Sequence, residues 1–213
     1  MKSEDDLRRE IVTVCRNLHQ YGYNTSINGN VSVRFDEDCM LITPSGCSMG
    51  LVKERDIVLS DMNGNGVTGG NPSSEYRLHA AIYNKRIDAN AIIHVHSTHS
   101  LALSLFDMDL LNDTYITVSP IPITEYARIG SENVTVVIDP YILRYNWAIL
   151  RRHGSVAWES DLLSAYHRIE GMEHLCKVLL TAMAVGRPEP MREFARKELL
   201  DMWGLDYLGG RTC

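Results

Sequence analysis

The sequence predicts an α/β domain in which helices cover the faces of a central sheet. Strand patterns crowd the middle of the chain, and strong helical patterns stand at both ends. The length, 213 residues, suits one domain over 1–213 with a substantial buried core, and no repeat or linker divides it.

The first element expected is an amphipathic helix. Apolar residues recur at helical spacing from Leu7 to Tyr21, acidic residues crowd the first turn, and Gly22 ends it. Three strands follow at "NVSVRF" (30–35), "CMLITP" (39–44) and "DIVLSD" (56–61), the first two joined as a hairpin.

The middle of the chain contains both helical and strand patterns. A helix is expected near Pro72, because the proline and the serines after it favour a first turn. "NAIIHVHS" (90–97) then reads as a buried strand, and "TYITV" (114–118) and "VTVVID" (134–139) as further strands.

The remaining elements lie near the end of the chain. "WAILRRHGSVAW" (147–158) predicts two strands that meet at His153-Gly154. Helical patterns return from Asp161 to about Ala184, and a last helix begins near Pro190.

Composition narrows the classes of function. The formal net charge of -6 and the lack of a long basic cluster argue against a nucleic-acid partner. No apolar run approaches a membrane span of about 20 residues, and the acidic start is unlike a signal peptide. Five scattered cysteines without CxxC spacing are typical of reduced thiols, so we expect a cytoplasmic protein.

A metal site is indicated by "HVHSTHS" (94–100). Alternate side chains of a strand share a face, so His94 and His96 point the same way, roughly 6–7 Å apart along the strand. His153, beside a glycine that permits close backbone approach, offers a third imidazole, and three His with an open position suit a catalytic zinc ion. His99 is the weaker candidate, since it lies beyond the strand end.

Two alternatives stay open at this point. The His pair could be a hydrogen-bonded pair in the core, which is the commoner fate of a buried histidine. His79 follows Glu75 by one helical turn and is expected to pair or pack rather than to bind metal.

An anion site is indicated by three stretches rich in Gly, Asn and hydroxyl groups: "NGNVS" (28–32), "TPSG" (43–46) and "PSSE" (72–75). Backbone N–H groups at a helix start, together with serine hydroxyls, can hold phosphate. Each stretch by itself is also an ordinary turn or cap. Spacing does not reveal whether the three converge.

Together, "GNVSVR", "LITPSG", "PSSE", "HVHSTHS" and "RRHG" resemble, in this order, the class II aldolase/epimerase family over about residues 5–185. The resemblance implies a three-layer α/β/α fold with a mostly antiparallel mixed sheet. It also implies a homotetramer whose active sites lie at subunit interfaces.

The resemblance also implies roles for particular residues. His94, His96 and His153 match the zinc-binding histidines, and Glu75 matches the acidic residue that completes the resting metal site and serves as catalytic acid/base. Tyr115 falls where a tyrosine assists proton transfer. The positions that match the phosphate site are Gly29, Asn30, Ser45, Gly46, Ser73 and Ser74.

This chain departs from the fuculose-phosphate aldolases of the family at three places. Ile27 replaces a hydroxyl side chain, so one phosphate contact is in doubt. Trp203 and Tyr207 stand near the position of a catalytic tail tyrosine. The segment "TVSPIPITEYARIGS" (117–131) is shorter than its counterpart, which puts the aldehyde pocket in doubt.

The chemistry favoured is metal-dependent cleavage. A retro-aldol reaction must stabilise an enediolate with a Schiff-base lysine or a Lewis-acid metal. Most of the five lysines stand among polar neighbours at predicted helix ends or surface faces, which are poor settings for a depressed pKa. We expect zinc to polarise the ketose carbonyl and Glu75 to transfer the proton of the enediolate carbon. Tyr115 is expected to protonate or deprotonate the departing alkoxide. Mn²⁺ and Co²⁺ also suit the His-and-carboxylate set.

The expected activity is that of an aldolase that cleaves a ketose 1-phosphate to dihydroxyacetone phosphate and an aldehyde. The expected substrate is a fuculose-phosphate-like sugar or a deoxy or methylthio pentulose phosphate. The alternatives are a 3-oxo-tetronate 4-phosphate decarboxylase, then a ribulose-phosphate 4-epimerase. A further alternative is a non-enzymatic protein that binds sugar phosphates around a structural zinc.

Overall fold

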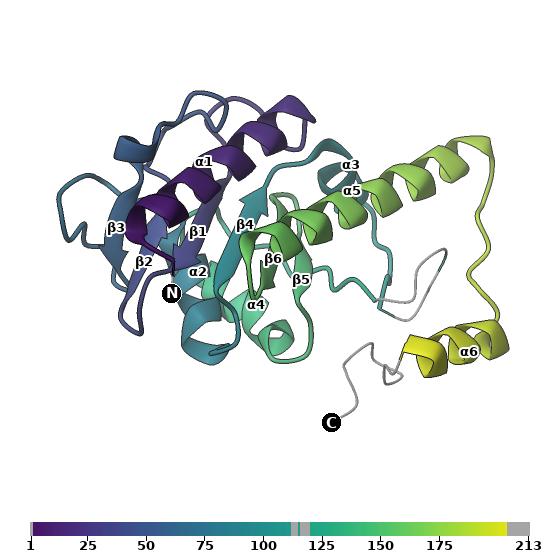
Figure 1. Cartoon of the computed structure of the whole chain (residues 1–213). Helices are drawn as coiled ribbons and strands as arrows, with labels where there is room; N and C mark the ends of the chain where they lie inside the picture. Colours follow the sequence, from purple (N-terminus) through teal and green to yellow (C-terminus); the bar gives the residue numbers. More distant parts are fainter. Residues whose placement is uncertain (1, 112–114, 116–119, 204–213) are drawn as a thin grey trace.

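The computed structural model describes residues 2–111, 115 and 120–203. They form a six-stranded sheet of order β3-β2-β1-β4-β6-β5 (Figure 1). Every neighbouring pair of these strands is antiparallel, and an isolated bridge between Ile123 and Ile149 is parallel, which confirms the expected mostly antiparallel sheet. The strands are β1 (Asn30–Arg34), β2 (Cys39–Ile42), β3 (Val58–Asp61), β4 (Ala91–Val95), β5 (Trp147–Leu150) and β6 (Gly154–Glu159).

Helices cover both faces of this sheet and complete the three layers. α1 and α5 contact each other across one face, and α3 packs on α5 (Figure 1). α2 and α4 contact each other on the opposite face. The helices are α1 (Glu4–Gln20), α2 (Tyr76–Lys85), α3 (Thr98–Leu103), α4 (Asn133–Ile142), α5 (Leu162–Val185) and α6 (Glu193–Trp203), with a 3-10 turn η1 (Glu54–Asp56).

The central strand β1 shows how the two faces differ. Val31 and Val33 are buried in the hydrophobic core, whereas the alternate residues Asn30 and Ser32 hydrogen-bond to side chains of α2 or its first turn. His94 of β4 pairs with Asn30 in the register, so it lies on the α2 face. β1 and β4 therefore turn Asn30, Ser32 and His94 toward α2.

The expected strand at "VTVVID" is wrong, because these residues form part of α4. Val134, Ile138 and Ile142 are buried at a spacing of four, which is one stripe of a helix. Burial of that stripe outweighs the β preference of the valines. The expected strand at 114–118 lies outside the described residues except for Tyr115.

The other expected elements are confirmed within a few residues at each end. Ser3 and Asp6 form a capping box at the start of α1, which is typically worth about 1 kcal/mol for its Ser cap. Asp161 accepts a bond from Ser164 N and caps α5. The short helix α3, directly after the histidine-rich strand, was not expected.

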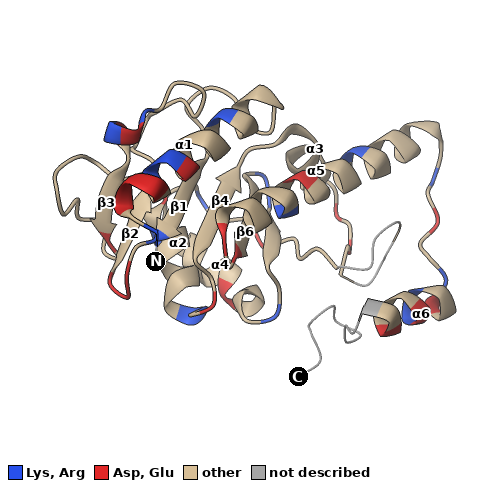
Figure 2. Cartoon of the chain, in the orientation of Figure 1, with Lys and Arg blue, Asp and Glu red and all other residues tan. Residues whose placement is uncertain are grey.

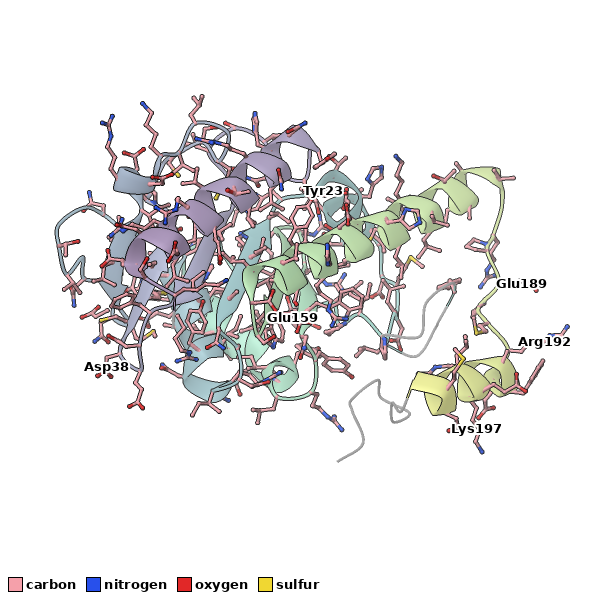
Figure 3. The ribbon with its side chains drawn as sticks, viewed as in Figure 1. Tyr23, Asp38, Glu159, Glu189, Arg192 and Lys197 are labelled. Carbon is pink, nitrogen blue, oxygen red and sulfur yellow. The ribbon has the colours of Figure 1, made fainter. Side chains whose placement is uncertain are left out.

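The C-terminal part of α5 and the helix α6 project from the sheet (Figure 1). Glu189, Arg192 and Lys197, which are exposed, lie in this projecting segment (Figure 3). Acidic and basic residues are interspersed along the ribbon (Figure 2). Across the described part of the chain, no helix has the length and apolar character needed to cross a bilayer.

Candidate metal centre

Two histidines reach the site from the end of β4. His94 is the fourth residue of the strand and His96 follows its last residue, so both side chains leave the same face. Their Nε2 atoms lie 3.1 Å apart and their rings meet edge to face. His94 Nδ1–H donates to the Ser155 carbonyl of β6 (2.9 Å), which directs Nε2 toward the site.

The third histidine comes from the turn between β5 and β6. A Cβ on Gly154 would overlap the carbonyl oxygen of Val95, so the glycine lets this turn approach the end of β4. Arg152 adopts a left-handed conformation (φ 58°) just before His153. The ring of His153 then lies 4.7 Å from that of His94 and 4.9 Å from that of His96. The sequence prediction for this glycine is confirmed.

Glu75 reaches the same point from the first turn of α2. It is the N-cap residue of α2, yet its side chain makes no capping bond and turns toward the imidazoles. Oε2 lies 3.2 Å from His94 Nε2, and Oε1 lies 2.9 Å from His153 Nε2. Only 7% of Glu75 is exposed, so this carboxylate depends on its neighbours for polar contacts.

The four side chains fit a divalent metal ion. One ligand atom from each of Glu75, His94, His96 and His153 lies within 4.8 Å of all the others. Four ligands at tetrahedral zinc are about 3.3 Å apart, since each bond is about 2.0–2.1 Å, close to the three separations above. His153 Nε2 is buried and makes no aligned hydrogen bond, as expected of a nitrogen aimed at a shared central point.

The electrostatics of the cluster favour a carboxylate among mostly neutral rings. Burial alone would raise the pKa of Glu75, but the charge of His94 and the close approach of the His153 and His94 rings hold this pKa well below its usual range. Burial, joined by the neighbouring His94 and His153, lowers the pKa of His96 to about 3, and burial also lowers that of His153. Neutral imidazoles are the form that binds metals.

His94 behaves differently from its two neighbours. Burial by itself lowers its pKa, but the adjacent Glu75 carboxylate and hydrogen bonds raise it above the ordinary value. A metal ion at the site would therefore compete with a proton on His94.

The three stretches predicted to bind an anion do lie side by side. Pro44 and Pro72 form an antiparallel bridge, and Ser45 N donates to the Asn71 carbonyl (3.0 Å). Thr43 connects these two stretches to the stretch 28–32. Its N–H donates to the Val31 carbonyl (3.0 Å), and its Oγ1 accepts from Val31 N–H (3.2 Å). Sequence spacing could not show this convergence.

The residues predicted to hold phosphate differ in exposure. Ser45, Gly46 and Ser74 are exposed. Ser73 is buried and its Oγ accepts from Glu75 N–H (3.3 Å), so it braces the metal centre instead of facing solvent. Gly29 has φ 67°, and a Cβ there would lie 2.7 Å from the backbone oxygen of His94, which ties this loop to the metal centre.

Asn30 has a place that its predicted role did not suggest. It is buried, its Nδ2–H donates to Glu75 Oε2 (2.9 Å), and its Oδ1 accepts from His79 (2.5 Å). His79 pairs and packs as expected, but this link to Glu75 through Asn30 was missed. The available signal was that Glu75 and His79 share a helix face.

Other candidates from the sequence lie elsewhere. His99 belongs to α3 and its Nδ1 lies 2.7 Å from Glu173 Oε1. Tyr115 is partly buried against the hydrophobic core, and its catalytic role stays a prediction. Trp203 is the last residue of α6, and Tyr207 lies outside the described residues.

Comparisons with known proteins agree with this geometry. Residues 9–180 match the family model described as Class II Aldolase and Adducin N-terminal domain. An L-fuculose phosphate aldolase of Escherichia coli O6:H1 is 34% identical over 189 residues, 87% of each chain. A 3-oxo-tetronate 4-phosphate decarboxylase of Cupriavidus necator is 32% identical over 85% of this chain and 87% of its own. A solved L-fuculose 1-phosphate aldolase superposes with a TM-score of 0.84 at 30% identity, covering 96% of this chain and 99% of its own.

Proposed function

The chain belongs to the class II aldolase and adducin N-terminal domain family, and on that premise we propose that it is a metal-dependent lyase for a ketose 1-phosphate. The products are dihydroxyacetone phosphate and an aldehyde. The observation that carries the proposal is the convergence of Glu75, His94, His96 and His153 from three separate parts of the chain.

The metal is held by the three imidazoles and by the Glu75 carboxylate. Three nitrogen ligands and one oxygen ligand suit Zn²⁺ best, with Mn²⁺ or Co²⁺ as possible replacements. Once bound, the ion supplies Lewis-acid polarisation of the substrate carbonyl. The Ser155 carbonyl accepts from His94 Nδ1–H and so keeps Nε2 directed toward the metal position.

The substrate phosphate is proposed to bind at the three joined stretches. Ser45, Gly46 and Ser74 are exposed there, so their hydroxyl and backbone N–H groups are available to an anion. Asn30 has two N–H bonds on Nδ2, of which one meets Glu75, and we assign the other to the phosphate. Gly29 and Ser73 shape this site through their contacts with the metal centre.

The protein residues must move two protons during cleavage. The bond that breaks joins the carbon beside the ketone to the next hydroxyl-bearing carbon. The first carbon keeps the electron pair and must gain a proton, and the hydroxyl on the second must lose one as it becomes the aldehyde. We assign the first transfer to Glu75 and the second to Tyr115. Trp203 and Tyr207 are the two candidates for the catalytic tail residue that the family resemblance implies.

The decarboxylase is the second candidate, because the relative with that name is 32% identical to this chain. Loss of carbon dioxide beside a ketone also leaves an electron pair on carbon, so the same metal centre and the same Glu75 serve both reactions. The paired serines Ser73 and Ser74 favour the aldolase over the decarboxylase, and the longer acid at Glu75 favours the aldolase over the epimerase.

The test is an assay of the purified, zinc-loaded protein against several ketose 1-phosphates and a 3-oxo-tetronate 4-phosphate. Release of triose phosphate supports the aldolase, and release of carbon dioxide alone overturns it in favour of the decarboxylase. Glu75→Gln protein prepared in parallel controls for contaminating enzymes. Turnover of no substrate would reject both activities.

Metal removal separates these activities from a purely structural zinc site. A catalytic site should lose turnover when a chelator strips the metal, keep its far-ultraviolet circular dichroism, and regain turnover with zinc. A structural site would unfold on stripping.

The assembly and the location are also proposals. We propose a homotetramer with active sites at subunit interfaces, as the family resemblance implies. We further propose a cytoplasmic location and small sugar phosphates as partners, without nucleic acid or membrane.

A further inference from the structure

A line of buried polar side chains runs from the metal centre into the layer between α2 and the sheet. On α2, Glu75, His79 and Tyr83 are spaced by four residues and therefore share one helix face. On β1, Asn30 and Ser32 alternate and share one strand face. These two rows face each other, and none of the five residues is more than 7% exposed.

Four hydrogen bonds connect the rows. Tyr83 Oη lies 2.8 Å from Ser32 Oγ, and Ser32 Oγ lies 2.6 Å from His79 Nδ1. On the other side of the ring, His79 Nε2 lies 2.5 Å from Asn30 Oδ1. Asn30 Nδ2 then lies 2.9 Å from Glu75 Oε2. The chain ends on the carboxylate that we propose as the proton carrier.

The chemistry of the groups gives every bond one direction. An ionised carboxylate only accepts, so the Asn30 amide must turn its N–H toward Glu75 and its oxygen toward His79. Since that oxygen only accepts, His79 must carry its proton on Nε2. Burial lowers the pKa of His79 to about 3, so the ring is neutral and Nδ1 accepts from Ser32. Ser32 Oγ in turn accepts a hydrogen bond from the Tyr83 hydroxyl group.

This chain locks the Asn30 amide in one orientation. If the amide turned over, its oxygen would face the Glu75 carboxylate and its N–H would face the N–H of His79, and both bonds would be lost. Asn30 is 2% exposed and His79 is 0% exposed, so the loss of both bonds would cost the free energy of leaving buried polar groups unpaired. The far end is fixed as well, because the Arg34 guanidinium lies 4.6 Å above the Tyr83 ring.

We propose that His79 is a positioning residue for Glu75. Held in its Nε2–H form by Ser32 and Tyr83, it fixes the Asn30 amide, which holds Glu75 Oε2 in place beside His94. The kinetic consequence rests on the proposed function, since it assumes that Glu75 carries the proton. The proton arrangement of the chain does not depend on that assumption.

The first experiment measures the proton arrangement directly. The full chain, ¹⁵N-labelled at histidine, is examined by long-range ¹H–¹⁵N correlation spectra, metal-free and with zinc, and His79→Gln identifies the signals of this ring. We expect a protonated Nε2 and an unprotonated Nδ1 in both forms. A proton on Nδ1, or on both nitrogens, would overturn the proposal whatever the enzyme cleaves.

The second experiment separates positioning from plain packing. His79→Gln keeps an N–H donor for Asn30 Oδ1, whereas His79→Leu fills the space without one. For His79→Leu we expect kcat to fall by about ten- to a hundredfold, the range found for groups that orient metal ligands. KM should rise less than kcat falls, through the proposed phosphate contact of Asn30, and the zinc content should stay nearly unchanged. His79→Gln should recover most of this loss, and His167→Leu, at an exposed position of α5, is the control for a histidine remote from the chain of bonds.

Equal losses of kcat in His79→Gln and His79→Leu would show that the ring only fills space. A rise in KM with kcat unchanged would show that His79 supports only the proposed phosphate contact of Asn30 and not Glu75, and would also overturn the proposal. If His79→Leu does not fold, the spectra of the parent protein still decide. If the parent cleaves no substrate, the proposed function fails while the spectra test the proton arrangement separately.

Discussion

Glu75 and Glu173 are both buried carboxylates beside histidines, and their partners differ in kind. Glu173 accepts from the backbone N–H groups of His99 (2.8 Å) and Ser100 (2.9 Å), and the His99 ring lies against the same carboxylate. Glu75 accepts one amide N–H from Asn30 and otherwise faces imidazole nitrogens. Backbone amides cannot release protons or bind metal, whereas imidazoles can do both.

The comparison teaches what makes a buried carboxylate chemically useful. Glu173 is 5% exposed and Glu75 is 7% exposed, so burial does not separate them. Glu173, on α5, anchors the start of α3 and thereby the segment that follows His96. Glu75 has partners that can exchange, as the acid/base role that we propose for it requires.

The largest expected difference, in metal binding and turnover, is between a histidine near Glu75 and a histidine near Glu173. His96→Ala is expected to lose metal binding and cleavage together, because His96 is one of three converging imidazoles. His99→Ala, three residues along the chain, should keep its metal. Metal content by atomic spectroscopy and turnover on the same samples are the measurements. Full activity of His96→Ala would remove the zinc centre from the mechanism.

The carboxylates themselves should differ next in rate. Glu75→Gln is expected to keep its fold and metal but to lose about two to four powers of ten in kcat, typical of removing a general base. Glu173→Gln, assayed where it remains folded, should keep most of its kcat. Steady-state kinetics with the zinc-loaded variants provide the comparison. If Glu75→Gln stays within a few-fold of the parent, another group moves the proton.

The smallest expected effect is on stability, and here the substitution of Glu173, which should leave kcat nearly unchanged, should be the costly one. Glu173→Gln is expected to lower the free energy of unfolding by about 1.5–3 kcal/mol, because hydrogen bonds to a charged acceptor are lost. Glu170→Gln, an exposed site on the same helix, should stay within about 0.5 kcal/mol. Urea unfolding of the metal-free proteins measures both. An unchanged midpoint for Glu173→Gln would contradict the anchoring role.

Much of the fold was predictable where the pattern is strong and local. α1 and α5 have long apolar stripes with caps, and β5 and β6 flank a His-Gly turn, so their positions followed from periodicity. α4 was mistaken for a strand, because its valines favour a strand and the sequence does not show which of its residues are buried. The short α3 carries too few residues for a periodic signal.

The candidate site divides in the same manner. The shared face of His94 and His96 followed from strand geometry alone. His153 was predicted as a third imidazole beside its glycine, and the family motifs added Glu75. The link from Glu75 through Asn30 to His79 was missed, because it joins a helix face to a strand face.

The amino-acid sequence by itself determined the periodicities, the family motifs and the alternation that puts two imidazoles on one side of β4. The periodicities and the alternation depend on covalent geometry, which acts over a few residues. Only the tertiary structure decided that Glu75 and His153 meet those imidazoles, that three loops lie side by side, and that Asn30 faces Glu75. Such contacts join distant parts of the chain, and the burial of apolar surface that sets sheet register and helix packing brings them together.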